Sequence, residues 1–81
     1  MEVDIYASRD YNDYYLYLHR GADVDAVLPE ALRKRLGRLR PALTLTLTVE
    51  TRLVRADAAR VLEALTKDGF YLQLPPPAEE R

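Results

Sequence analysis

Few residues of this chain are of a type that carries catalysis. It has one histidine, His19, and no cysteine, which excludes disulfides, thiolate metal sites and cysteine nucleophiles. A serine or threonine nucleophile needs a base, normally a histidine, that a third group orients. His19 lies between a stretch with strand character and a predicted loop, and we expect it to be a solvated side chain. One histidine without cysteine is also too little for a zinc site.

Sequence motifs for cofactors and metals are not found. Asp23 and Asp25 resemble the start of a calcium loop, but the twelfth position counted from Asp23 is Lys34, where an EF-hand has glutamate. The three glycines do not form the pattern of a nucleotide-binding or phosphate-binding loop. The sequence therefore predicts no cofactor, no metal and no enzymatic activity.

Tyrosines are the first candidates for a binding surface. Four of the six are predicted to share one face of a sheet, and these are Tyr6, Tyr15, Tyr17 and Tyr71. Tyrosines beside arginines can stack on the bases of single-stranded nucleic acid. Tyrosine and arginine are also enriched in protein interfaces. Alternatively, a helix or the stems of arginine side chains cover these rings as a second small core.

Basic side chains form the second candidate surface, which consists of Arg33, Lys34, Arg35 and Arg38. Residues 1–32 hold seven acidic and two basic side chains, whereas residues 33–60 hold eight basic and two acidic ones. Such asymmetry can indicate a face that binds a polyanion such as RNA. It also fits a solvated helix face whose charges the acidic block neutralises in the fold.

Length and composition indicate one small domain. A chain of 81 residues buries roughly 60% of the surface that the unfolded chain exposes, enough for a thin core but not for a large catalytic cleft as well. The first four residues lack the basic and apolar regions of a signal peptide. No apolar run approaches the roughly 18 residues that cross a bilayer. We therefore expect a soluble cytoplasmic domain that does not associate with membranes.

Hydrophobic periodicity predicts four strands. In residues 3–7, 42–49 and 70–74 apolar residues alternate with others, as in a half-buried strand. Residues 14–19 are dense in aromatic residues, which favour a pleated surface. The first two strands are joined by the turn-forming residues 8–13 and are predicted to form an antiparallel hairpin.

Two helices are predicted between these strands. The first begins at Pro29 and ends before Arg40, because Pro41 prevents its continuation. Its buried stripe is Leu28, Leu32 and Leu36. The second has Asp57 as its N-cap and Gly69 just beyond its end. Its buried stripe is Val61, Leu62 and Leu65.

The predicted strands give the sheet two chemically different faces. One is aliphatic and consists of Val3, Ile5, Leu16, Leu18, Leu43, Leu45, Leu47, Leu72 and Leu74. The other carries the four tyrosines, the threonines and Gln73. We expect a helix to cover the aliphatic face and the strand at residues 42–49 to be central. On that expectation Leu45→Ala costs about 2–5 kcal/mol, as core truncations do.

Four segments in the same order resemble the YcgL domain family. They are residues 15–18, residues 28–32 with Gly37, residues 53–57, and the ending Gly-Phe-Tyr-Leu-Gln-Leu-Pro-Pro-Pro at 69–77. The resemblance implies a small bacterial protein with an α/β/α sandwich fold, a helix on each sheet face, and no catalytic residue. Members often begin with a cysteine-containing strand that leads to Tyr-Arg-Ser. This chain has Ile-Tyr-Ala-Ser at residues 5–8, so a role for that cysteine or arginine does not apply.

Together these observations predict an α/β domain over residues 1–77 with a polar tail at 78–81. Its predicted element order is β-β-α-β-α-β, with a four-stranded, mainly antiparallel sheet and two helices. The predicted function is a non-enzymatic module that binds a protein partner near Tyr15 and Tyr17. Association with RNA through the basic helix face at residues 33–38 is the alternative.

Overall fold

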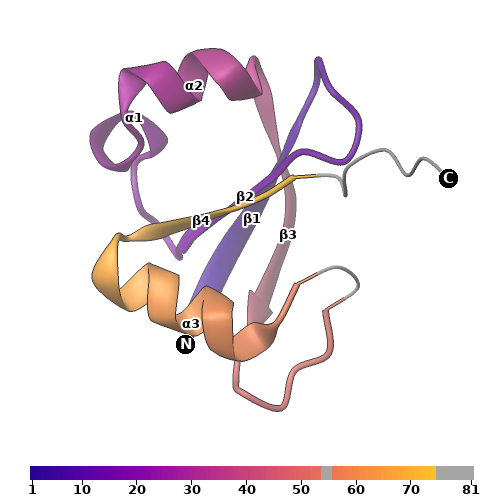
Figure 1. Ribbon diagram of the computed structural model, residues 1–81, viewed down its shortest axis with the longest axis vertical. Helices are drawn as coiled ribbons and strands as arrows, with labels where there is room; N and C mark the ends of the chain where they lie inside the picture. Colours follow the sequence, from indigo (N-terminus) through magenta and orange to yellow (C-terminus); the bar gives the residue numbers. More distant parts are fainter. Residues whose placement is uncertain (54–55, 75–81) are drawn as a thin grey trace, which may run out of the picture.

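A computed structural model describes residues 1–53 and 56–74. In order, the elements are β1 (Glu2–Ser8), β2 (Tyr15–His19), α1 (Val24–Val27), α2 (Glu30–Leu36), β3 (Leu39–Thr46), α3 (Ala58–Lys67) and β4 (Phe70–Gln73). The strands form one antiparallel sheet in the order β3-β1-β2-β4. Helices α1 and α2 lie on one face of this sheet and α3 on the other (Figure 1). The predicted sandwich is confirmed, with the single-turn α1 as a third helix.

The face assignment predicted for the hairpin is wrong, and its register shows why. Ile5 lies opposite Tyr17, and Tyr6 lies opposite Leu16. Residues directly opposite each other in an antiparallel pair lie on the same face. The aliphatic side chains of β1 therefore share a face with Tyr15 and Tyr17, and Tyr6 lies on the other face with the leucines of β2.

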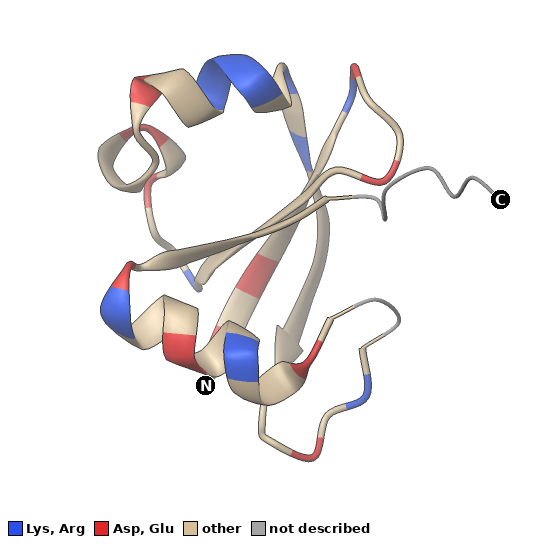
Figure 2. Ribbon diagram, viewed as in Figure 1, with Lys and Arg blue, Asp and Glu red and all other residues tan. Residues whose placement is uncertain are grey.

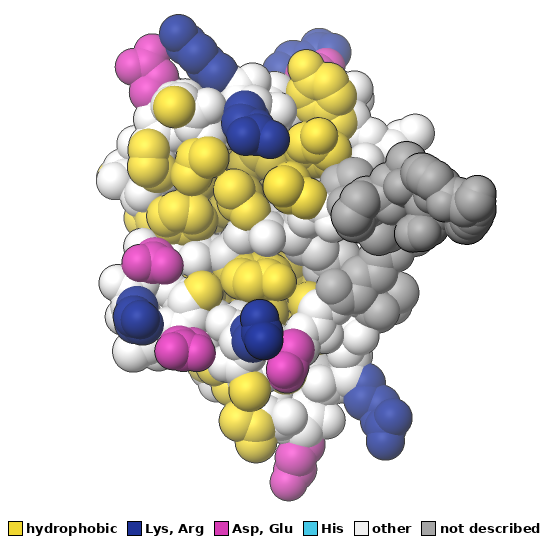
Figure 3. All heavy atoms as spheres, viewed as in Figure 1, with side chains coloured by type: hydrophobic (Ala, Val, Ile, Leu, Met, Phe, Trp, Pro, Cys, Tyr) yellow, Lys and Arg dark blue, Asp and Glu magenta, His cyan; other side chains and the backbone are white. Residues whose placement is uncertain are grey.

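The sheet separates two hydrophobic clusters. The buried residues on the α3 side are Val3, Ile5, Tyr17, Leu47, Ala58, Val61 and Leu65. Those on the side of α1 and α2 are Leu16, Leu18, Leu28 and Leu36. In Figure 3, apolar atoms accordingly gather in two bands, one on each side of β4. Strand β2 supplies both clusters because successive side chains of a strand point to opposite faces.

Strand β3 lies at an edge of the sheet, not at its centre as predicted. It starts at Leu39 instead of residue 42 and pairs only with β1. Pro41 lies within it, opposite Tyr6, beside a shift in register. The edge position leaves Leu45 half-buried and Leu43 54% exposed. Leu45→Ala should therefore cost less than the roughly 2–5 kcal/mol typical of a buried core leucine.

Signals at the helix ends are confirmed. The Asp57 side chain accepts a hydrogen bond from the backbone N–H of Ala59 at 3.1 Å, which caps α3. Gly69 follows α3 with a φ of 86°, a left-handed conformation that favours glycine. Gly37 ends α2 with a φ of 73°, and a side chain there would collide with Asp10. The turn from α2 into β3 therefore requires glycine.

The C-terminal strand contributes less to the core than predicted. Phe70 and Leu72 pack on the α1 and α2 side, but Leu74, just after β4, is 42% exposed. The predicted proline exit at residues 75–77 and the tail at 78–81 lie outside the described residues. None of the helices formed by residues 1–53 and 56–74 is long and apolar enough to span a membrane.

Candidate functional site

A groove of about 440 Å³ opens on the α3 side of the sheet. All four strands, the β1–β2 connection and the β3–α3 connection contribute to its lining. The lining residues are Ile5, Asp13, Tyr15, Tyr17, Ala42, Leu43, Leu45, Thr51, Arg52, Leu53 and Gln73. We call it the sheet groove. Its apolar lining with a few polar groups, and its volume, are typical of sites that bind ligands.

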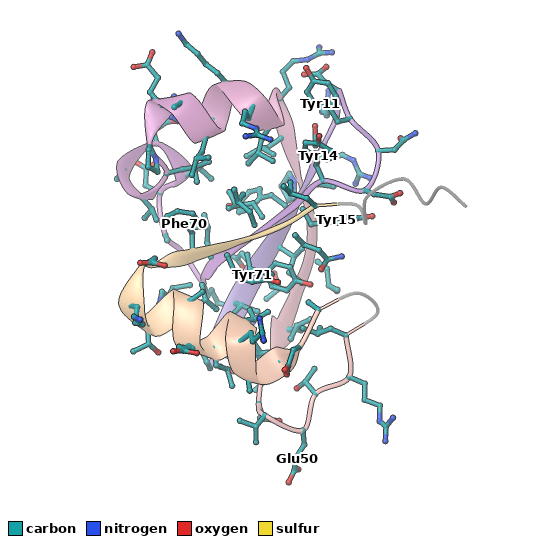
Figure 4. The ribbon with its side chains drawn as sticks, viewed as in Figure 1. Tyr11, Tyr14, Tyr15, Glu50, Phe70 and Tyr71 are labelled. Carbon is teal, nitrogen blue, oxygen red and sulfur yellow. The ribbon has the colours of Figure 1, made fainter. Side chains whose placement is uncertain are left out.

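The tyrosines of β2 line one side of the sheet groove, and Tyr71 of β4 contacts the ring of Tyr17. Tyr15 lies opposite Gln73, and Tyr17 lies opposite Tyr71. The Tyr17 hydroxyl donates to Oε1 of Gln73 at 2.8 Å, and its ring meets that of Tyr71 edge-on, with centroids 5.7 Å apart. Tyr71 points towards α3, and Tyr15 lies at the start of β2 (Figure 4). Tyr17 is only 4% exposed, so it supports the groove while the half-buried Tyr15 is available to a partner.

The environment of Tyr17 keeps its phenol protonated. Burial raises the pKa of the Tyr17 phenol above its ordinary value of 10.0, and Tyr71 and Tyr15 raise it further. A neutral phenol is the form that donates to the Gln73 carbonyl oxygen. The polar pair at the base of the groove is therefore uncharged at neutral pH.

Connections supply the parts of the groove that sequence reasoning missed. Oγ1 of Thr51 accepts a hydrogen bond from the backbone N–H of Thr48 at 2.9 Å, which closes the turn after β3. This turn leads into Arg52 and Leu53, two of the lining residues. Asp13 adopts a φ of 67° before β2, a conformation that aspartate tolerates better than most residues. No sequence motif marks these residues, because their position depends on how the connections cross the sheet.

Three of the four residues in the predicted basic surface form ion pairs. Arg33 pairs with Asp25 at 3.4 Å and Lys34 with Glu30 at 3.7 Å. Arg38 pairs with Asp10 at 2.8 Å. Figure 2 shows the basic part of α2 on the same side of the molecule as the acidic residues of α1. The acidic and basic blocks of the sequence thus neutralise each other here, and Arg35 has no ion pair with another described residue.

The strongest of these ion pairs also perturbs a pKa. Both side-chain and backbone hydrogen bonds from Arg38 lower the pKa of the Asp10 carboxyl below its ordinary value. Asp10 thereby joins the β1–β2 connection to the start of β3. The contact fixes two connections against each other, which is a structural role.

Tyr6 is separated from the sheet groove. It lines a second hollow of about 460 Å³ on the opposite face, together with Arg33, Lys34 and Gly37. The structure therefore brings Tyr15, Tyr17 and Tyr71 together but places Tyr6 near the basic residues of α2. The predicted surface is two surfaces, one on each side of the sheet.

His19 is not the solvated residue predicted. Its Nε2 lies 3.0 Å from the backbone carbonyl oxygen of Leu65, and the side chain is half-buried. The contact joins β2 to the last turn of α3, where the Leu65 carbonyl oxygen also accepts from the backbone N–H of Gly69 at 3.1 Å. Within the described part of the chain, no three carboxylate or imidazole groups come together in a way that could hold a metal ion.

Comparison with known proteins gives one consistent result. A family model described as YcgL domain matches residues 3–76. A YcgL domain-containing protein of Saccharophagus degradans is 46% identical over 79 residues, which cover 98% of this chain and 86% of that protein. Protein YcgL of Escherichia coli is 43% identical over 76 residues, covering 94% of this chain and 69% of that protein.

Proposed function

Because the chain belongs to the YcgL domain family, whose name identifies a domain but no reaction, we propose a function from the geometry of the sheet groove. The protein is a small non-enzymatic interaction module of the cytoplasm. Its sheet groove binds an apolar segment of a partner protein, with Tyr15 as the main aromatic contact. The single observation that carries this proposal is the apolar groove of about 440 Å³ beside Tyr15.

The floor of the groove favours an apolar ligand segment. Ile5 is 7% exposed and supports the base of the groove, whereas Leu43 is 54% exposed and can be covered by a bound segment. Covering apolar area contributes about 25 cal/mol per Å². Tyrosine is frequent among the residues that dominate interface energetics, because its ring adds contact area and its hydroxyl a hydrogen bond.

Polar groups at the rim fit a peptide rather than a purely apolar molecule. Asp13 and Arg52 lie on different connections beside the groove and carry opposite charges. Gln73, at the base, is only 9% exposed and already accepts from Tyr17. An extended peptide offers backbone C=O groups to the Arg52 guanidinium while its side chains contact the floor.

Selection of peptides from a random phage-displayed library tests this function. We expect peptides with apolar residues to be enriched on the wild-type protein. Tyr15→Ala and Leu53→Glu should each reduce their binding at least about tenfold, as loss of an interface anchor does. Tyr11→Ala is the matched control, because Tyr11 is 49% exposed and does not line the groove. Tyr17 is unsuitable for this test because its truncation would damage the core.

Chemical-shift mapping of the selected peptides decides the outcome. Shifts at Ile5, Leu43 and Tyr15 are expected for the sheet groove. Peptides that bind the variants as well as the wild type, or that map to α2, would contradict the proposal. Circular dichroism of each variant confirms that the fold is intact.

RNA association through α2 is the alternative, and the same protein tests it. The residues are Arg33, Lys34 and Arg35 of α2 with Arg38 just beyond its end, and three of the four have acidic partners. Because those partners repel phosphate, we expect weak retention of single-stranded RNA. A gel shift whose affinity falls steeply with salt, and which Arg35→Ala abolishes, would favour RNA over the sheet groove.

A further inference from the structure

The outer edge of β3 has backbone groups that no described residue pairs. Residues 1 and 47 form a hydrogen-bonded pair, through Leu47 N–H to the Met1 carbonyl at 2.7 Å and the Met1 ammonium to the Leu47 carbonyl at 2.9 Å. In an antiparallel ladder such pairs alternate with non-bonded ones. The backbone groups of Leu45 and Leu43 therefore point to β1, and those of Thr44 and Thr46 point away from the sheet.

This edge lacks the devices that usually prevent strand addition. Exposed edge strands are commonly protected by charged side chains, by prolines or by covering segments. Between Arg40 and Glu50 the chain has nine residues without a charge. The single proline and the bulge both lie at the start of β3, at Pro41 and beside it. The half from Leu43 to Thr46 is unprotected within the described structure.

We propose that two copies of this chain associate through β3, antiparallel, about a two-fold axis at Thr44. This inference goes beyond the proposed function, since it uses the backbone edge of β3 and leaves Tyr15 free, although it shares Leu43 and Leu45 with the lining of the sheet groove. In this register Thr44 pairs with Thr44 of the partner copy. The dimer then has one continuous eight-stranded sheet, twice the four strands of each copy.

The register is self-complementary on the α3 face. Leu43 lies opposite Leu45 of the partner copy, and the reverse contact follows from the symmetry of an isologous interface. Leu43 is the most exposed leucine of the strand, at 54%. Directly opposite aliphatic side chains pack across strands. The pairing therefore covers the apolar group that the monomer leaves in water.

Charges at the two ends of β3 also complement each other. Arg40 lies near the start of the strand and Glu50 in the turn beyond its end (Figure 4). Neither forms an ion pair with another described residue. An antiparallel two-fold brings the Arg40 end of one copy to the Glu50 end of the other. A parallel arrangement would instead place like charges together.

Sedimentation velocity over a wide concentration range tests the association. We expect a reversible dimer in the wild type. Thr44→Pro removes both symmetric Thr44 hydrogen bonds without breaking the ladder to β1, and should raise the dimer Kd about 10- to 100-fold. Arg40→Glu should weaken the dimer, and adding Glu50→Arg should restore it. A wild type that stays monomeric at all concentrations overturns the proposal.

Cysteine cross-linking tests the register. Because the chain has no native cysteine, each single-cysteine variant can form a disulfide only with the same residue of another copy. In Thr44→Cys the two thiols lie on a hydrogen-bonded pair, with Cα atoms about 5.5 Å apart, within disulfide range. Thr46→Cys is the matched control, since both threonines donate to an acidic residue of β1. Its thiols would be roughly 13 Å apart along the strand. Efficient disulfide formation in Thr44→Cys alone supports the axis, and equal formation in both variants refutes it.

Discussion

Tyr17→Phe is the substitution for which the structure predicts the clearest energetic result. It removes one hydroxyl and keeps the ring, so the edge contact with Tyr71 is retained. The partner of that hydroxyl, Oε1 of Gln73, belongs to a side chain that is only 9% exposed. The substitution therefore leaves a buried acceptor without its donor and opens almost no cavity.

The expected loss of stability depends on whether one partner of the buried hydrogen bond is removed or both are. Leaving one buried polar group unsatisfied costs about 1–3 kcal/mol, whereas replacing both partners with apolar groups is nearly neutral. Tyr17→Phe should thus destabilise the fold by about 2 kcal/mol, which lowers the Tm by about 8–16 °C for a domain of this size. The double variant with Gln73→Leu should recover most of that loss.

Urea unfolding followed by circular dichroism measures these free energies. Tyr11→Phe is the matched control, because Tyr11 is 49% exposed, and it should change stability by less than about 0.5 kcal/mol. The pH dependence adds an independent readout. Since the pKa of Tyr17 is higher in the folded state, stability is lost as the pH rises above about 10. Tyr17→Phe lacks this alkaline loss.

Two results would refute the reasoning. A Tyr17→Phe protein as stable as the wild type would mean that Gln73 is satisfied by water and that the base of the groove is wet. A double variant less stable than either single variant would mean that packing, and not the hydrogen bond, decides the energetics at this position.

Three further predictions concern other parts of the fold. Leu65 is 1% exposed, and Leu65→Ala should lower the free energy of unfolding by about 2–5 kcal/mol. Leu43 is 54% exposed, and Leu43→Ala should lower it by less than about 1 kcal/mol in the same urea melts. Equal losses would contradict the edge position of β3. Asp57→Ala should lose about 1 kcal/mol with the α3 cap, and Asp57→Asn should retain most of it, as thermal melts will show. Arg38 holds the pKa of the Asp10 carboxyl in the folded protein below 3.8, so the free energy of unfolding should fall as the pH drops through that folded pKa. Arg38→Gln should raise the Asp10 pKa in an NMR titration. An unchanged pKa would mean that the ion pair does not cause the shift.

Local signals predicted the elements well. The stripe of Leu28 and Leu36, the Asp57 cap and the left-handed Gly69 depend on neighbours within a few residues, and the structure confirms all of them. The hairpin was predictable for the same reason. Strand β3 starts earlier than predicted, at Leu39, and includes Pro41. Proline is compatible with an edge strand beside a bulge because no backbone N–H is needed there for a ladder hydrogen bond.

The relation between sheet faces was not predictable from these signals. A shift of one residue in register exchanges the two faces of a strand, and the connection from Arg9 to Tyr14 sets that register. Ile5 therefore packs with Tyr17 and not with Leu16. The sheet groove depends on this register and on two connections, so the sequence predicted its tyrosines but not Leu53 or Arg52.

Strand β2 places neighbouring positions of the sequence in different hydrophobic clusters. Leu16, Tyr17 and Leu18 are consecutive and all at most 4% exposed, yet they alternate between the two clusters. Substitutions at Leu16 and Tyr17 should combine with little epistasis, because the sheet lies between the groups they contact. Tyr17 and Gln73, 56 positions apart, should show strong epistasis. We therefore expect the layer under α3 and the layer under α1 and α2 to tolerate substitutions independently of each other.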